Sequence, residues 1–131
     1  MLKKMVIIPS LLILLSGCNP PGNTRLTSPI TPLTYQAGSS VFILKKDCVT
    51  GVSSRNHGHN VFFNIKNSPD CSMQFEDFFS RNVGEYVDVY FNHVAIMDKT
   101  KIVSPLTGRN GFFQYVVLRA NTDKIIKYYK Q

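Results

Sequence analysis

Short runs of β-branched and aromatic residues, separated by turn residues, recur along the chain from residue 41 onward. Such runs are typical of β-strands. They occupy residues 41–44, 60–65, 86–91, 94–96 and 112–118. Between the third and the fourth run, Asn92-His93 suits a tight turn, so these two strands are expected to pair as a hairpin. The segment 49–59 is rich in turn residues and predicts a loop.

Two segments instead carry the spacing of an amphipathic helix. In the first, apolar residues fall at i, i+3, i+4 and i+8, which predicts one buried stripe on a helix that ends at Gly84. The stripe consists of Phe75, Phe78, Phe79 and Val83. In the second, Asn121 can cap a helix that runs through Ile125, Ile126 and Tyr129. The order of elements predicts an α+β fold, an antiparallel sheet with one or two helices packed on one face.

Composition divides the chain into three parts. Residues 1–17 have the features of an export signal, because Lys3-Lys4 precedes an apolar run that is too short to span a bilayer. Residues 18–40 are rich in Pro, Thr, Ser, Gly and Asn, which predicts a flexible tether. Residues 41–131 are long enough for a single globular α+β domain.

The signal segment ends in Leu14-Leu15-Ser16-Gly17-Cys18, which resembles the lipobox of bacterial lipoproteins. The resemblance implies cleavage before Cys18 and a lipidated cysteine, whose two or three acyl chains would anchor the protein to a membrane. Asn19 after the cysteine implies sorting to the periplasmic face of the outer membrane, in a host that has one. The alternative is an ordinary secretory signal with a chance cysteine at its end.

The chain is basic, with 15 Lys and Arg residues against 8 Asp and Glu residues and a net charge of +7. Removal of residues 1–17 takes two lysines away and leaves 13 − 8, a charge of +5. A basic surface can attract anionic lipid head groups, a polyanionic envelope polymer or an acidic protein. Nucleic acid is not an expected partner, because the protein is held in the envelope and its positive residues are dispersed.

Two cysteines, Cys48 and Cys71, remain once Cys18 is lipidated. An even number of cysteines in an oxidising compartment predicts a disulfide between them, with a loop worth ~3.4 kcal/mol by the chain-entropy relation. A competing argument comes from topology. If residues 49–59 are a loop beside the first strand, the two cysteines lie at opposite ends of the sheet, ~23 Å apart. Both expectations hold only if Cys48 lies beyond a short first strand and the segment 49–59 folds back.

Histidines provide the one candidate metal set. His57 and His59 flank a glycine and could chelate a metal with His93 as a third ligand. The expected strand directions place His93 at the opposite end of the sheet, and no motif of nucleophilic catalysis is present in the sequence. We therefore expect a protein that is not an enzyme and needs no cofactor. A lipid-anchored metal-dependent hydrolase is the alternative.

The chain contains nine phenylalanines, and two adjacent pairs lie on predicted strands. The members of Phe62-Phe63 and of Phe112-Phe113 must point to opposite faces of a sheet. One member of each pair is expected in the core. The other is either covered by a helix or exposed, and exposure would indicate a binding surface.

The order of elements from residue 60 to residue 126 also has a precedent. The residues that carry it are Phe75 to Phe79, Asn82-Val83-Gly84, Tyr86 to Ile96, Pro105-Leu106-Thr107-Gly108 and Gly111-Phe112-Phe113-Gln114. This pattern resembles the head subdomain of the first periplasmic region of SecD, a protein-export subunit. The resemblance implies a shared fold and an export-related or envelope protein-binding task.

The leading expectation is therefore a non-enzymatic, lipid-anchored envelope protein that binds another envelope protein or polymer. A small inhibitor or exclusion lipoprotein of phage or plasmid type is an alternative.

Overall fold

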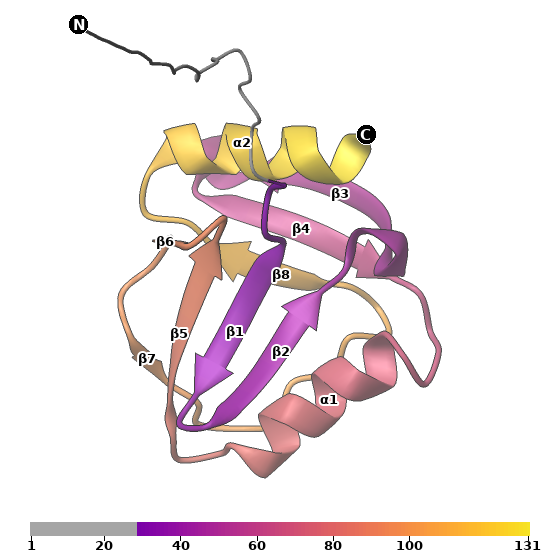
Figure 1. Ribbon diagram of the computed structural model, residues 1–131, viewed down its shortest axis with the longest axis vertical. Helices are drawn as coiled ribbons and strands as arrows, with labels where there is room; N and C mark the ends of the chain where they lie inside the picture. Colours follow the sequence, from indigo (N-terminus) through magenta and orange to yellow (C-terminus); the bar gives the residue numbers. More distant parts are fainter. Residues whose placement is uncertain (1–28) are drawn as a thin grey trace, which may run out of the picture.

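A computed structural model describes residues 29–131 of the chain (Figure 1). The predicted signal segment, Cys18 and the first part of the predicted tether lie outside this range. The described chain contains two sheets, two helices and two short 3-10 turns. The helices are α1 (Ser72–Arg81) and α2 (Arg119–Lys130), and the 3-10 turns are η1 (Lys46–Cys48) and η2 (Asn56–Gly58). The strands are β1 (Leu33–Ala37), β2 (Ser40–Leu44), β3 (Val49–Arg55), β4 (Asn60–Ile65), β5 (Tyr86–Phe91), β6 (Val94–Ala95), β7 (Thr100–Lys101) and β8 (Phe112–Tyr115).

The predicted α+β fold is confirmed, with every strand pair antiparallel. The strands do not form the single sheet that the sequence predicted. One sheet has the order β2-β1-β5-β6, with β7 also paired to β5, and the other has the order β3-β4-β8. Helix α2 lies against β3 and β4, whereas α1 lies beside β2 (Figure 1). The two helices therefore pack against different sheets.

Strand β1 lies in the segment predicted to be a flexible tether. Leu33, Tyr35 and Ala37 alternate with polar residues and are buried, and β1 occupies the middle of its sheet between β2 and β5. The predicted domain boundary at residue 41 is therefore wrong, and the folded part begins at least eight residues earlier. The hairpin to β2 turns at Gly38, which has a φ of 59° that glycine adopts without strain.

Strand β3 occupies part of the predicted loop. It pairs with β4 from Val49 opposite Ile65 to Arg55 opposite Asn60, with one irregularity in register between Val49 and Gly51. The strand forms the edge of its sheet, and all of its residues are half-buried or exposed, although Val49 and Val52 pack against the core. Pairing with the apolar strand β4 thus adds to the strand preference of these two valines and holds a segment that is otherwise rich in turn residues extended.

The first helix buries three of the four residues of the predicted stripe, namely Phe75, Phe78 and Phe79. Val83 remains exposed because the helix stops at Arg81. The last turn is held by Asn82, whose buried side-chain amide donates to the C=O of Phe78. The second helix begins at Arg119 and not at the predicted Asn121 cap.

Aromatic rings join the two sheets into one core. Phe75 of α1 stacks on Phe112 of β8, with ring centroids 4.3 Å apart. The rings of Phe63 in β4 and Tyr129 in α2 pack in a T-shaped arrangement with centroids 5.2 Å apart. The ring centroids of Phe42 in β2 and Phe75 are 5.7 Å apart. The inner face of the three-stranded sheet is thus covered by these packing contacts. Its outer face takes no part in them.

Candidate functional site: an aromatic sheet face and an adjoining cleft

The predicted disulfide between Cys48 and Cys71 is present, and the Cα atoms of the two cysteines are 5.5 Å apart. The two cysteines are not at opposite ends of a sheet, because residues 49–55 are a strand and not a loop. Cys48 directly precedes β3, and β3 runs back along β4, so Val49 lies opposite Ile65 close to Cys71. The disulfide fastens the start of the three-stranded sheet to the residue before α1.

The candidate histidines lie on two different hairpins. His57 belongs to η2 between β3 and β4, and the His59 ring nitrogen Nδ1 lies 3.2 Å from the C=O of Val116. His93 lies in the β5–β6 turn, where its Nε2 is 2.8 Å from the hydroxyl of Thr31. Within residues 29–131, no three His, Cys, Asp or Glu side chains come close enough together to hold a metal ion.

His93 was expected at the opposite end of the sheet from His57 and His59 because the sequence predicts a loop over residues 49–59 at one end of a single sheet. Residues 49–55 are instead strand β3 and the chain forms two sheets, so this reason for separating the histidines no longer applies.

The adjacent phenylalanines divide between core and surface. Phe63 and Phe112 are buried inside, whereas Phe113 is 59% exposed and Phe62 is half-buried on the opposite face. The two outward rings are direct cross-strand neighbours with centroids 4.8 Å apart. Of the two outcomes that the sequence left open, exposure therefore applies to Phe113.

Three further side chains extend the outward pair into a continuous surface. Tyr115, two residues after Phe113, points to the same face, and its ring stacks with His59 at a centroid distance of 6.4 Å. The guanidinium of Arg55 lies 5.0 Å from the centre of the Phe62 ring, within cation–π range. We call this surface the aromatic face; it consists of Arg55, His59, Phe62, Phe113 and Tyr115.

Gly111 allows the aromatic face to pack closely at the start of β8. Its φ is 86°, and a Cβ atom at this position would lie 2.4 Å from the Phe62 ring and 2.8 Å from the C=O of Phe63. Any larger residue would therefore displace both the half-buried Phe62 ring and the backbone of β4. The sequence pointed to the two phenylalanine pairs but not to Arg55 and Tyr115. The alternation of strand β8 could have identified Tyr115.

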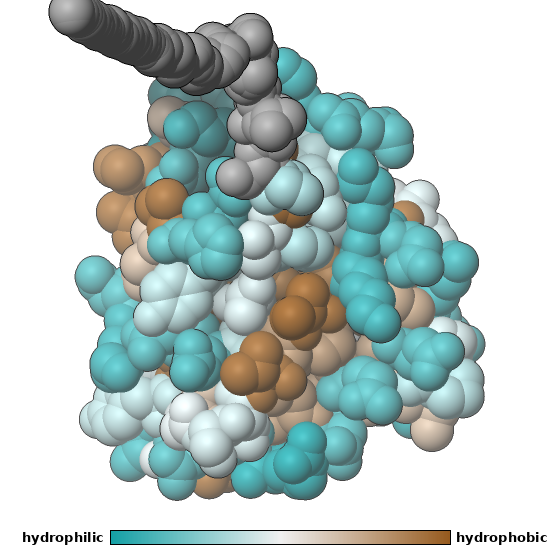
Figure 2. Space-filling model, in the orientation of Figure 1, coloured by the Kyte–Doolittle hydropathy of each residue, from teal (hydrophilic) through white to brown (hydrophobic). Residues whose placement is uncertain are grey.

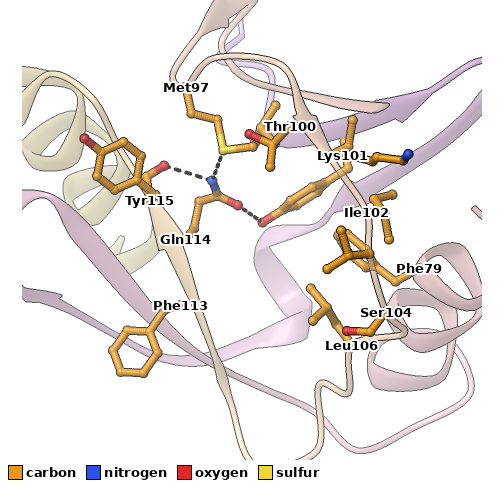
Figure 3. A pocket seen from close by; sticks show the side chains of 14 residues that line it. Phe79, Met97, Thr100, Lys101, Ile102, Ser104, Leu106, Phe113, Gln114 and Tyr115 are labelled. Carbon is orange, nitrogen blue, oxygen red and sulfur yellow. Dashed lines mark hydrogen bonds between the residues drawn. The ribbon is translucent and has the colours of Figure 1, made fainter. Parts of the chain in front are cut away.

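Beside β8 the surface opens into a cleft of about 260 Å³ between this strand and the segment 97–106 (Figure 3). The lining is mostly apolar and includes Ile102, Val103 and Leu106. Figure 3 places the Gln114 side chain inside the cleft, whereas Phe113 points to the other side of the strand. The cleft and the aromatic face are therefore adjacent surfaces on the two sides of one strand.

Gln114 organises the floor of the cleft (Figure 3). Its side-chain amide donates to the C=O of Tyr115 at 2.8 Å and lies 3.1 Å from the Met97 sulfur. Its side-chain oxygen accepts a hydrogen bond of 2.7 Å from the hydroxyl of Tyr35. Burial raises the pKa of Tyr35 well above its ordinary value, so this hydroxyl stays protonated and remains the donor.

A second apolar patch lies on the outer face of the five-stranded sheet. Figure 2 shows hydrophobic side chains gathered over β2, where Val41 and Ile43 are exposed. The patch is narrow, since its neighbours on β1 are the polar residues Thr34 and Gln36. We therefore take the aromatic face as the stronger candidate site.

Comparisons with family models, with curated proteins and with solved structures find no match to this chain. Neither helix of the described chain has the length and hydrophobicity that a membrane crossing requires.

Proposed function

We propose that this chain is a lipid-anchored binding protein of the bacterial envelope, which holds another envelope protein on its aromatic face. The observation that carries the proposal is the exposure of Phe113 and Tyr115 side by side with Phe62 and Arg55. Aromatic and arginine side chains are enriched at the energetic centres of protein interfaces. An exposed phenylalanine contributes nothing to the core, so its contacts are available to a partner.

The charge of the aromatic face favours an acidic partner. Arg55 is exposed at one end of the face, the side chain of Arg119 lies close to the neighbouring Gly58, and the five residues of the face include no carboxylate. A partner with apolar side chains for the rings and an Asp or Glu for Arg55 would match both features. The predicted export signal and the lipobox-like sequence support an interaction in the envelope, with Cys18 as the proposed anchor.

The predicted resemblance to the SecD head subdomain implies a protein-binding task and so also supports a protein partner. The proposal assigns no reaction to the chain and no metal or other cofactor.

In-cell photocrosslinking tests the proposal. A photoreactive phenylalanine analogue would replace Phe113 in the full-length chain, with replacement of Met73 as the matched control. Met73 lies on α1, outside the aromatic face and the cleft, and is 55% exposed against 59% for Phe113, so the two positions are similarly accessible. We expect a discrete protein adduct from position 113 that is absent from position 73. The substitution Arg55→Glu should weaken the adduct, because it reverses the charge of the one arginine in the aromatic face.

Equal labelling from positions 113 and 73 would contradict the proposal, because it would indicate random collision. An adduct made only with an envelope polymer would overturn the protein partner while leaving the face as a binding surface.

A further inference from the structure

The edge of β8 that faces the cleft carries unpaired backbone groups. In the antiparallel ladder with β4, Gln114 lies opposite Val61, and the N–H of Val116 donates to the C=O of His59. Hydrogen-bonded pairs alternate along such a ladder, so the backbone groups of Phe113 and Tyr115 point away from β4. The neighbouring N–H of Val117 confirms this direction, since it donates to Ile96 on the other side.

Most of these outward groups lack a partner. Among residues 29–131, no group bonds to the N–H or C=O of Phe113 or to the N–H of Tyr115, and the C=O of Tyr115 accepts only from the side chain of Gln114. An edge with unpaired donors and acceptors is a template for another strand. Its position along a cleft leaves room for that strand beside it.

The opposite wall of the cleft is formed by β7, which also turns backbone groups toward the cleft. The Val117–Ile96 hydrogen bond is where the edges of the two sheets meet, and beyond it the cleft lies between β8 and β7. In β7, Lys101 lies opposite Tyr86, and the N–H of Ile102 donates to Glu85. By the same alternation, the backbone N–H and C=O of Lys101 point away from β5.

We infer that the partner contributes an extended segment that adds as a strand to the free edge of β8 inside this cleft, with an acidic residue facing Lys101. This inference rests on the proposed function, and it names how the partner binds. Main-chain hydrogen bonds to Phe113 and Tyr115 would supply affinity, and alternate side chains of the segment would supply specificity.

The cleft lining determines the chemistry of that segment. Lys101 is the only charged residue among the fourteen that line the cleft. Its side chain forms no ion pair within the described part of the chain. The apolar residues around it include Val103, which is 79% exposed at the rim. The complement of this lining is a strand with apolar side chains on one face and one carboxylate at the position of Lys101.

A random ten-residue peptide display library is the probe for the test, with the full-length chain in detergent as bait. We expect selected peptides to alternate apolar and polar residues and to carry Asp or Glu at one fixed position. Lys101→Glu should change that position to Lys or Arg. The control Lys124→Glu makes the same charge change on α2, outside the cleft, and should leave the selection unchanged. Selection unaffected by Lys101→Glu would overturn the inference.

Amide hydrogen exchange, followed by NMR on the most enriched peptide, tests strand addition directly. Binding should slow exchange of the Phe113 and Tyr115 amides at least tenfold, whereas the Phe112 and Gln114 amides are already bonded to β4 and should change little. A peptide that binds without slowing the first two amides would overturn strand addition. Protection of those amides by protein concentration alone would assign the edge to a second copy of this chain and overturn the inference.

The crosslink from position 113 separates the two proposals. A specific protein adduct, together with unprotected edge amides, would leave the proposed function in place and remove strand addition alone. Loss of the adduct would remove the proposed function itself.

Discussion

The hydroxyl of Tyr129 joins α2 to the end of the β1–β2 ladder. It accepts a hydrogen bond of 2.9 Å from the N–H of Leu33 and donates one of 2.6 Å to the C=O of Leu44. Both leucines are fully buried, and they lie opposite each other in the strand pair. Burial raises the pKa of Tyr129 far above its ordinary value, so the phenol stays protonated and can donate one hydrogen bond while it accepts the other. A single oxygen thus satisfies two backbone groups.

The substitution Tyr129→Phe removes this oxygen and keeps the ring. It leaves one buried N–H and one buried C=O without their partner, each at a cost of ~1–3 kcal/mol, so the expected loss in free energy of unfolding is ~2–6 kcal/mol. For a domain of this size even the lower value corresponds to a fall in Tm of ~8 °C or more. The ring contact with Phe63 remains, so the loss reports the hydroxyl.

Urea unfolding of the full-length chain measures this loss. The matched control is Tyr128→Phe on the same helix, because the Tyr128 hydroxyl has no hydrogen-bond partner among residues 29–131. The control ring keeps its position against Lys46, whose Nζ lies 4.3 Å from the ring centroid. We expect the control to change stability by less than ~0.5 kcal/mol. Equal effects of the two substitutions, or a loss below ~1 kcal/mol for Tyr129→Phe, would refute the reasoning.

Four further predictions concern the rest of the chain. The double variant Cys48→Ala/Cys71→Ala should lose ~3 kcal/mol of stability, and a reductant should then lower the urea midpoint of the wild type only. Gly111→Ala should cost ~1–3 kcal/mol more than Gly84→Ala in urea unfolding, because both have positive φ but only the first meets neighbouring atoms. Metabolic labelling with a palmitate analogue should mark the wild type and fail with Cys18→Ser; retained label would contradict lipidation. Chelator should leave Tm unchanged, and a fall would point to a metal coupled to folding.

The sequence alone was sufficient for elements in which the local pattern and the final environment agree. The α1 stripe of Phe75, Phe78 and Phe79 has helical spacing, and these residues are buried because a helix with that spacing has one apolar face. The turn at Asn92-His93 was predicted from residue type, and both residues adopt the positive φ that such a turn requires. The disulfide was predicted from the number of cysteines and from the oxidising compartment that the signal segment led us to expect.

Only the tertiary structure decided the state of segments whose local preference is weak. Strand β3 has only two apolar residues among turn-type residues and is held as a strand by its pairing with β4, and β1 follows a Pro-rich segment yet lies at the centre of a sheet. The same holds for the candidate site. Alternation along a strand determines that Phe112 and Phe113 point to opposite faces, but which face is covered depends on where α1, α2 and the second sheet pack. The free edge of β8 likewise depends on the strand order: among residues 29–131 no strand pairs with β8 on the side away from β4, and a local sequence pattern does not specify which strands become neighbours.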